Sequence, residues 1–249
     1  MNRFFRDLFA RLLAVWALST FVASFLIFLW PSLLCGLIPN PTGQAWFIRI
    51  ANFWMRLWMP LVGCPPRVLG KEHFKKGETY IVVCNHNSLI DPPLSSPFIP
   101  GPNKTIAKAS FTKVPLFGWY YRIGGVMVDR KDEKSRRKSI DNMRAVLEKG
   151  MHMCIYPEGT RNRSGQPLKS FYDGAFKLAI ESGHSIIPGV IFNTRDILPA
   201  NRPFYFTPRP LILEFLKPIS PKGETVESLR EKTFKIMWDH YTLGPTKNS

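Results

Sequence analysis

The sequence predicts an α/β fold, with a mostly parallel sheet covered by helices, preceded by an amino-terminal membrane-embedded arm of two helices. Three observations support this prediction. Short runs of β-branched residues alternate with helical stretches after Pro66, an almost wholly apolar segment occupies residues 12–34, and polar residues suited to chemistry follow several predicted strands. We expect the arm to span residues 1–63 and the α/β domain to span residues 64–249.

The first segment of the arm is long enough to cross a bilayer. Residues 12–34 carry no charge, and about 20 apolar residues cross a hydrocarbon core as a helix. The segment is longer than the apolar region of a signal peptide. A simple crossing conflicts with charge, because Arg3, Arg6 and Arg11 precede the segment and a strongly basic body follows it. The positive-inside rule places both flanks in the cytoplasm.

The second segment of the arm has the composition of an interfacial helix. Residues 44–61 are rich in apolar and aromatic side chains, with two arginines on one side. We expect its tryptophans to lie at the level of the lipid headgroups. These tryptophans are Trp46, Trp54 and Trp58.

The sequence allows three arrangements of the arm. We prefer two helices, broken between Pro31 and Pro41, that dip into one leaflet and return, so that the catalytic domain faces the cytoplasm. A conventional single span is the alternative. An arm that merely packs on the soluble core is disfavoured, because residues 12–48 are all uncharged and a small core cannot hide so many apolar side chains.

The body is expected to hold six strands and three longer helices. Two of the helices end at a glycine, Gly150 or Gly183, which is a common signal for a helix carboxyl end. Strands that alternate with helices favour a parallel sheet covered on both faces. The predicted strands cover residues 80–84, 105–108, 126–128, 151–155, 186–191 and 211–215. The predicted helices cover residues 133–149, 172–182 and 224–241.

A histidine and an aspartate follow the first of these strands. His86 and Asp91 are five positions apart, so they meet only if the chain bends from strand into helix between them, and Pro92 favours such a bend. A carboxylate beside a neutral imidazole orients the ring as a general base for a hydroxyl. The alternative is a helix cap, in which Ser88 and Asp91 form a capping box or Asp91 is a plain N-cap.

Four segments, in this order, resemble a known family: residues 85–91, 125–130, 156–164 and 186–190. Together they resemble the four motifs of the glycerolipid acyltransferase family, and within it the 1-acylglycerol-3-phosphate acyltransferases, over residues 80–193. The resemblance implies a glycerol-3-phosphate acyltransferase-like fold. It also implies transfer of an acyl chain from acyl-CoA or an acyl-carrier protein to the free hydroxyl of a lysolipid acceptor, which gives phosphatidate when the acceptor is lysophosphatidate.

The resemblance assigns the third motif to the acceptor phosphate. It implies that Glu158 positions the site and that Gly159, Thr160 and Arg161 bind substrate. The residue types fit this role, because a guanidinium holds phosphate bidentately and glycine lets the backbone approach a ligand closely. The alternative for Glu158 and Arg161 is a local salt-bridged turn.

Three further residues bear on the acceptor. Arg130 is implied to bind phosphate in the same way, although a solvated basic face is the alternative for it. Lys108 is implied to lie near the phosphate or the reacting carbonyl. Asp173 departs from the family, which commonly carries a basic residue there. Either Asp173 faces away, or the acceptor is another lysolipid, such as a lyso-aminolipid.

The charge of the chain favours anionic partners. The sequence holds 34 basic and 18 acidic residues, a formal net charge of +16, which suits anionic membrane lipid and the phosphates of an acyl carrier. Nucleic acid is not expected, because no zinc-ligand or RNA-recognition pattern is present. We expect no metal or other cofactor and four reduced, buried cysteines. A non-catalytic basic membrane-binding protein is the competing class, but it leaves the polar residues at the strand ends unexplained.

Overall fold

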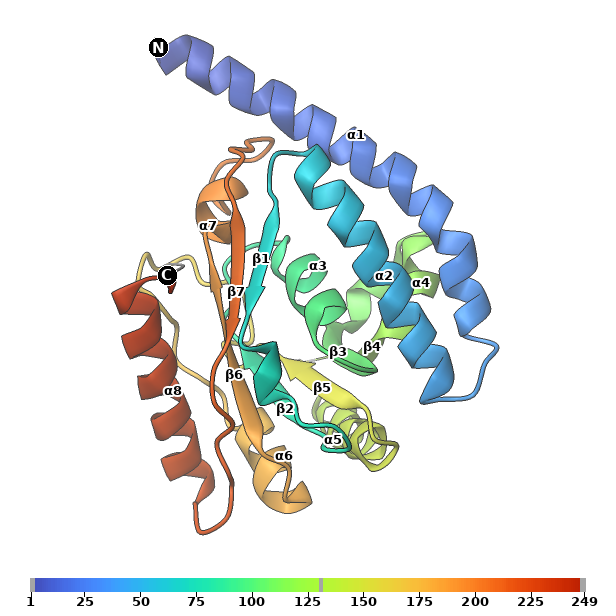
Figure 1. Cartoon of the computed structure of the whole chain (residues 1–249), viewed down its shortest axis with the longest axis vertical. Helices are drawn as coiled ribbons and strands as arrows, with labels where there is room; N and C mark the ends of the chain where they lie inside the picture. The colour runs from blue at the N-terminus through green and yellow to red at the C-terminus, as the bar shows by residue number, and fades with distance from the viewer. Residues whose placement is uncertain (1–2, 130–131, 247–249) are drawn as a thin grey trace.

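The computed structural model describes residues 3–129 and 132–246, and seven strands of this part of the chain form one sheet (Figure 1). The strands are β1 (Pro66–Leu69), β2 (Ile81–Cys84), β3 (Asn103–Lys108), β4 (Gly125–Val128), β5 (His152–Ile155), β6 (Ile186–Phe192) and β7 (Leu211–Phe215). Their order across the sheet is β1-β7-β6-β2-β5-β3-β4. Neighbouring strands are parallel except for β6 and β7. The predicted mostly parallel α/β fold is confirmed.

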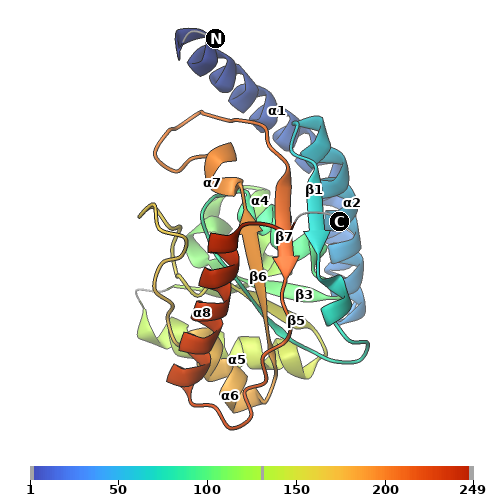
Figure 2. The ribbon, with the colours of Figure 1, turned by 60° about the vertical axis from the view of Figure 1, so that its left-hand side comes forward.

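Helices cover both faces of the sheet (Figures 1 and 2). The helices are α1 (Arg3–Cys35), α2 (Thr42–Leu61), α3 (Asp91–Ser95), α4 (Phe117–Gly124), α5 (Glu133–Glu148), α6 (Gly174–Ser182), α7 (Thr194–Ile197) and α8 (Val226–Leu243). One hydrophobic cluster joins the sheet to α1, α2 and α3, and a second joins it to α5, α6 and α8. Along β2 the side chains alternate between the two clusters, so this strand is a continuous apolar run in the sequence.

All six strands predicted from the sequence are present, and their ends differ by two residues at most. The three longer helices are present as α5, α6 and α8. The bend into a helix at Pro92 anticipated α3, but the sequence did not indicate β1 or the short helices α4 and α7. Strand β1 has four residues between a proline and a glycine, too few to show alternation. Helix α7 has four residues and α4 has eight, too few to show a clear amphipathic period.

The arm consists of α1 and α2, joined by a turn between Cys35 and Thr42. Helix α1 continues through Pro31, so the break lies at the later end of the predicted interval. Within the described residues, α1 is the one helix long and apolar enough to cross a membrane. The boundary between arm and domain at residues 63 and 64 stays a prediction, because α2 shares a hydrophobic cluster with the sheet.

The expected placement of two tryptophans at the lipid headgroups is wrong. Trp54 and Trp58 are only 3% and 6% exposed, and they pack between α1 and the body. Their indole N–H groups donate to Ser24 Oγ at 2.9 Å and Thr20 Oγ1 at 3.2 Å on α1. Trp46 remains exposed. Core packing, which the sequence argument disfavoured, is therefore correct for α2.

Candidate active site

The loop after β2 is fixed where it leaves the strand. Asn85 is fully buried, and its side chain donates to the backbone oxygen of Ile191 at 2.9 Å and accepts from the N–H of Ile191 at 2.7 Å. Both bonds join the loop to β6, the neighbour of β2 in the sheet. A buried amide whose donor and acceptor groups are both paired holds one conformation. The main chain is therefore fixed at the residue that precedes His86.

His86 and Asp91 are brought together as the sequence predicts. His86 Nδ1 lies 2.8 Å from Asp91 Oδ2. The same oxygen accepts hydrogen bonds from the backbone N–H groups of Asn87 at 2.6 Å and Ser88 at 2.7 Å. Since a carboxylate only accepts, Nδ1 carries the ring hydrogen and Nε2 holds the lone pair. This is the tautomer that a general base requires.

The capping alternative is met only in part. Asp91 is the first residue of α3 and not its N-cap. The backbone N–H of Ser88 donates to the Asp91 carboxylate as in a capping box, but Ser88 Oγ donates to the backbone oxygen of Leu198 at 3.0 Å. The carboxylate of Asp91 is completely buried, and its bonds run to the loop and to the imidazole.

An aromatic ring supports the imidazole from one side. The rings of His86 and Tyr156 are stacked with centroids 4.5 Å apart. The buried Tyr156 hydroxyl lies 2.6 Å from the hydroxyl of Ser95 on α3. Within the described residues His86 Nε2 has no hydrogen-bond partner, and the side chain keeps 18% of its exposure. A substrate can therefore reach the lone pair on Nε2, and the contacts with Asp91 and Tyr156 hold the ring in its orientation.

Glu158 joins the loop after β5 to the loop after β2. Its buried carboxylate accepts from the backbone N–H of His86 at 2.8 Å and from the backbone N–H of Lys169 at 3.1 Å. Burial raises the pKa of Glu158 to about 7, although these two hydrogen bonds lower it. The salt-bridged turn is wrong for Glu158, because among the described residues its carboxylate has no ion pair.

Arg161 is linked to the loop of His86 through its neighbour Asn162. The backbone N–H of Asn162 donates to the backbone oxygen of His86 at 2.6 Å. Gly159 has a positive φ of 72°, which glycine adopts without strain, and Thr160 Oγ1 accepts from Lys169 Nζ at 3.1 Å. The half-buried Arg161 guanidinium has no carboxylate partner in the described part of the chain. It is free to bind a phosphate bidentately.

Lys108 is exposed at the carboxyl end of β3, the strand beside β5. The pairing of these two strands puts it level with the start of the third motif, but it makes no hydrogen bond or ion pair with His86 or Arg161. Its place near the phosphate or the reacting carbonyl stays a prediction. Arg130 lies outside the described residues. Asp173 Oδ1 lies 2.5 Å from an Arg230 guanidinium nitrogen on α8, so an arginine compensates its charge. That Asp173 faces away from the acceptor stays a prediction.

The sequence did not indicate the residues on other elements that hold the loop carrying His86. Arg195 donates to Asn87 Oδ1 at 3.2 Å and to the backbone oxygens of Gly165 at 2.9 Å and Gln166 at 2.7 Å. Tyr156 and Ser95 support the imidazole from β5 and α3. No local pattern marks these residues, because their partners are distant in sequence. For Asn85 the sequence held one weak indication of a structural role, because its amide side chain directly follows a fully apolar strand.

Comparison with known proteins places this arrangement among acyltransferases. The sequence model of the acyltransferase family matches residues 65–192. The chain is 30% identical over 220 residues to the 1-acyl-sn-glycerol-3-phosphate acyltransferase of Cocos nucifera, covering 85% of this chain and 69% of that protein. It is 29% identical over 212 residues to the Saccharomyces cerevisiae protein of the same name, with 82% and 67% covered. The crystal structure of the 1-acyl-sn-glycerophosphate acyltransferase from Thermotoga maritima matches with a TM-score of 0.78 at 25% identity, covering 100% of both chains.

Proposed function

Since the chain belongs to the acyltransferase family, we propose that it transfers an acyl chain from a thioester to the free hydroxyl of 1-acylglycerol 3-phosphate and so forms phosphatidate. The observation that carries the proposal is the geometry of His86. Its Nδ1 is bound to Asp91 at 2.8 Å, its Nε2 is unpartnered among the described residues, and the phosphate-binding motif is tied to its backbone. The general base His86, the orienting carboxylate of Asp91 and the proposed acceptor site lie together at the carboxyl ends of the strands.

The reaction proceeds by direct transfer. His86 Nε2 removes the proton from the acceptor hydroxyl while its oxygen attacks the thioester carbonyl, and Asp91 stabilises the resulting imidazolium. The tetrahedral intermediate collapses with cleavage of the carbon–sulfur bond. The leaving thiolate takes the proton back from His86, so the products are the ester and a free thiol. No acyl-enzyme is formed.

The acceptor is held by its phosphate. Arg161 supplies a bidentate guanidinium, and Lys169 adds positive charge beside Thr160. The compensated charge of Asp173 removes the reason to favour a lyso-aminolipid over lysophosphatidate. The donor is acyl-CoA or an acyl-carrier protein, whose phosphates suit the net charge of +16.

The arm holds the enzyme in one leaflet. Body residues contact α1 near both of its ends, because Phe206 N donates to Ala10 O at 3.1 Å and Ile123 packs beside Cys35. Since one face of α1 is held by the body at these points, lipid cannot surround the helix on all sides, although most of the helix stays exposed. Its outer face is a continuous apolar strip: Phe4, Phe5, Leu8, Phe9, Leu12, Val15, Trp16, Leu18, Val22, Leu26, Ile27, Trp30 and Leu34. This strip enters the cytoplasmic leaflet, and the catalytic domain remains in the cytoplasm.

An acceptor screen tests the proposal. Purified enzyme in detergent or vesicles is given lysophosphatidate, lysophosphatidylcholine, glycerol 3-phosphate or a lyso-aminolipid, each with acyl-CoA and with acyl-carrier protein. We expect lysophosphatidate to be acylated with the highest kcat/KM, and the better thioester identifies the donor. Preference for another acceptor by tenfold or more contradicts the proposed substrate.

A further inference from the structure

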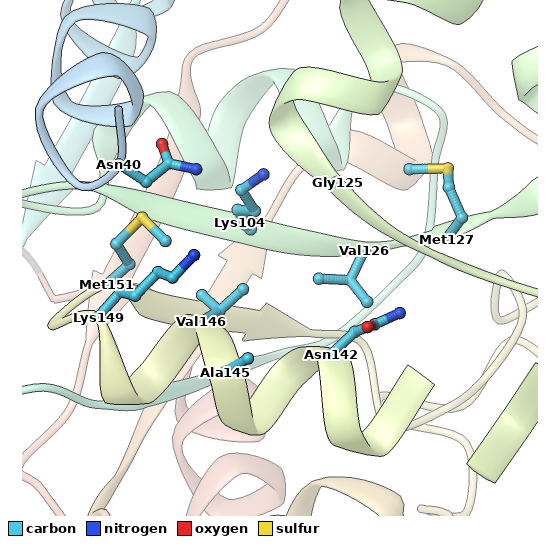
Figure 3. Close-up of a pocket in the computed structure, with 10 residues that line it drawn as sticks. All are labelled: Asn40, Lys104, Gly125, Val126, Met127, Asn142, Ala145, Val146, Lys149 and Met151. Carbon is cyan, nitrogen blue, oxygen red and sulfur yellow. The ribbon is translucent and has the colours of Figure 1, made fainter. Parts of the chain in front are cut away.

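A cavity of about 310 Å³ lies at the edge of the sheet, away from the catalytic histidine (Figure 3). It is bounded by the start of β3 and β4, by the last turns of α5 and by the turn between α1 and α2. Its floor is apolar and its rim is polar. The lining residues are Asn40, Lys104, Gly125, Val126, Met127, Asn142, Ala145, Val146, Lys149 and Met151.

Two lysines line this cavity without a counter-ion among the described residues. Lys149 reaches from the end of α5 toward Lys104 on β3 (Figure 3). No acidic side chain lines the cavity, and neither amine has an ion pair or hydrogen bond within the described residues. Burial lowers the pKa of Lys104, and the nearby charge of Lys149 lowers it further. Two nearby cations repel each other, and a bound anion would relieve that repulsion.

A second cavity of about 120 Å³ adjoins the first and shares Asn40 and Lys104 with it. It is lined by Gln44, which is only 1% exposed. Gln44 Nε2 donates to the backbone oxygen of Asn103 at 2.6 Å, whereas its Oε1 has no hydrogen-bond partner. Leaving a buried amide oxygen unpaired costs about 1–3 kcal/mol. Because this oxygen is fully enclosed, a ligand does not reach it, and Gln44 serves to join α2 to the start of β3.

This cluster is separate from the proposed active site. His86 follows the carboxyl end of β2, whereas Lys104 lies near the amino end of β3, which runs parallel to the shared neighbour β5. The two sites therefore lie toward opposite ends of the parallel strands. The cavity adjoins the turn of the arm, where Leu37 is 81% exposed, so it opens close to the membrane side of the enzyme.

We propose that the joined cavities bind a second ligand, a phosphate ester. Lys104 and Lys149 bind the phosphate, and the amide of Asn40 donates to it. The carboxyl end of α5 contributes about half a negative charge nearby, which two full positive charges outweigh. The ligand is either the headgroup of an anionic lipid or a soluble phosphate ester, and it ties the turn of the arm to the sheet.

Protection from chemical labelling tests this site in the wild-type enzyme. Lysines are acylated with a water-soluble amine reagent, and the rate at Lys104 and Lys149 is read by peptide mass spectrometry. The probes are sn-glycerol 3-phosphate and vesicles containing phosphatidylglycerol, and the controls are glycerol and phosphatidylcholine vesicles. Lys222, exposed before α8, reports general shielding.

We expect an anionic probe to slow labelling of Lys104 and Lys149 about tenfold at nine-tenths occupancy, with Lys222 unchanged. Protection by glycerol 3-phosphate identifies a soluble ligand, and protection by phosphatidylglycerol vesicles alone identifies a lipid headgroup. The site is wrong if neither anionic probe protects, or if the neutral and zwitterionic controls protect equally.

Two variants separate this site from the active site. Lys149→Gln, at an exposed position, should weaken the protection of Lys104, while the matched Lys222→Gln should not. Arg161→Ala should leave the protection intact, because the proposed acceptor site is not involved. Loss of protection in Arg161→Ala would mean that the effect starts at the active site, which overturns the second site and leaves the proposed function standing.

Discussion

The carboxylate of Glu158 accepts a hydrogen bond from the backbone N–H of His86 at 2.8 Å. The acid of the third motif therefore holds the main chain of the proposed catalytic histidine, and its other oxygen holds the backbone N–H of Lys169 at 3.1 Å. Both carboxylate oxygens of Glu158 are occupied by protein. This leaves Arg161 as the proposed phosphate ligand, and its neighbour Asn162 is bonded to the same histidine. Backbone hydrogen bonds thus fix the loops of the proposed base and the proposed phosphate site relative to each other.

Removing the base or its partner should lower turnover. His86→Ala should reduce kcat by roughly 10²–10⁴, and Asp91→Asn by up to about 10⁴ because the ring loses its orientation. The acceptor KM should stay within a few-fold in both variants. Steady-state kinetics on protein whose fold is verified by circular dichroism checks this, and near wild-type activity in either variant contradicts the assignment.

Removing the phosphate-binding guanidinium should act on the acceptor. Arg161→Ala should raise the KM for lysophosphatidate by a factor equivalent to about 2–5 kcal/mol, with little change in the KM for the acyl thioester. Arg163→Ala is the matched control, because Arg163 is exposed two positions along the same loop. Equal effects of Arg161→Ala on both substrates would place Arg161 outside the acceptor site.

The ionisation of Glu158 should make stability depend on pH. Because burial raises the pKa of Glu158 to about 7 from its ordinary value of 4.5, the folded state binds more protons than the unfolded state between these values. This group therefore lowers the free energy of unfolding as pH rises from 4.5 to 7, by up to about 3 kcal/mol. Urea unfolding of the wild type and Glu158→Gln at several pH values measures it. Parallel profiles for the two proteins would contradict the buried, shifted carboxyl.

The hydroxyl pair of Tyr156 and Ser95 should stabilise the fold beneath the imidazole. Tyr156→Phe or Ser95→Ala leaves one buried hydroxyl unpaired and should cost about 1–3 kcal/mol in the free energy of unfolding. The double variant should cost less than the sum of the two single variants. Tyr156→Phe keeps the ring stacked on His86, so its kcat should change little. Strict additivity in unfolding experiments would show that the two hydroxyls do not interact.

A cysteine at the turn of the arm should report its topology. If α1 lies in one leaflet, as proposed, Thr42→Cys in membranes should react with an impermeant thiol reagent only from the cytoplasmic side or not at all. The native cysteines give little background, since all four are buried. Lys222→Cys marks the side of the catalytic domain. Labelling at position 42 from the outside alone, with position 222 cytoplasmic, would show that the arm crosses the bilayer.

The sequence by itself determined the elements whose signals are local. The alternation of apolar runs with capped helices predicted the sheet, and the spacing of His86 and Asp91 with Pro92 after them predicted a strand that bends into a helix. The third motif predicted the loop that carries Glu158 and Arg161. Each of these depends on neighbouring residues, because backbone geometry and capping act over one or two turns.

Tertiary structure alone decided which surfaces meet. Trp54 and Trp58 have the same apolar rings whether lipid or protein covers them, so only the packing of α2 between α1 and the sheet identifies them as core. Tyr156 and Ser95 come together from β5 and α3, and Lys104 and Lys149 from β3 and the end of α5. The order of parallel strands is set by side-chain packing between helices and sheet, an interaction between distant segments that no local pattern encodes.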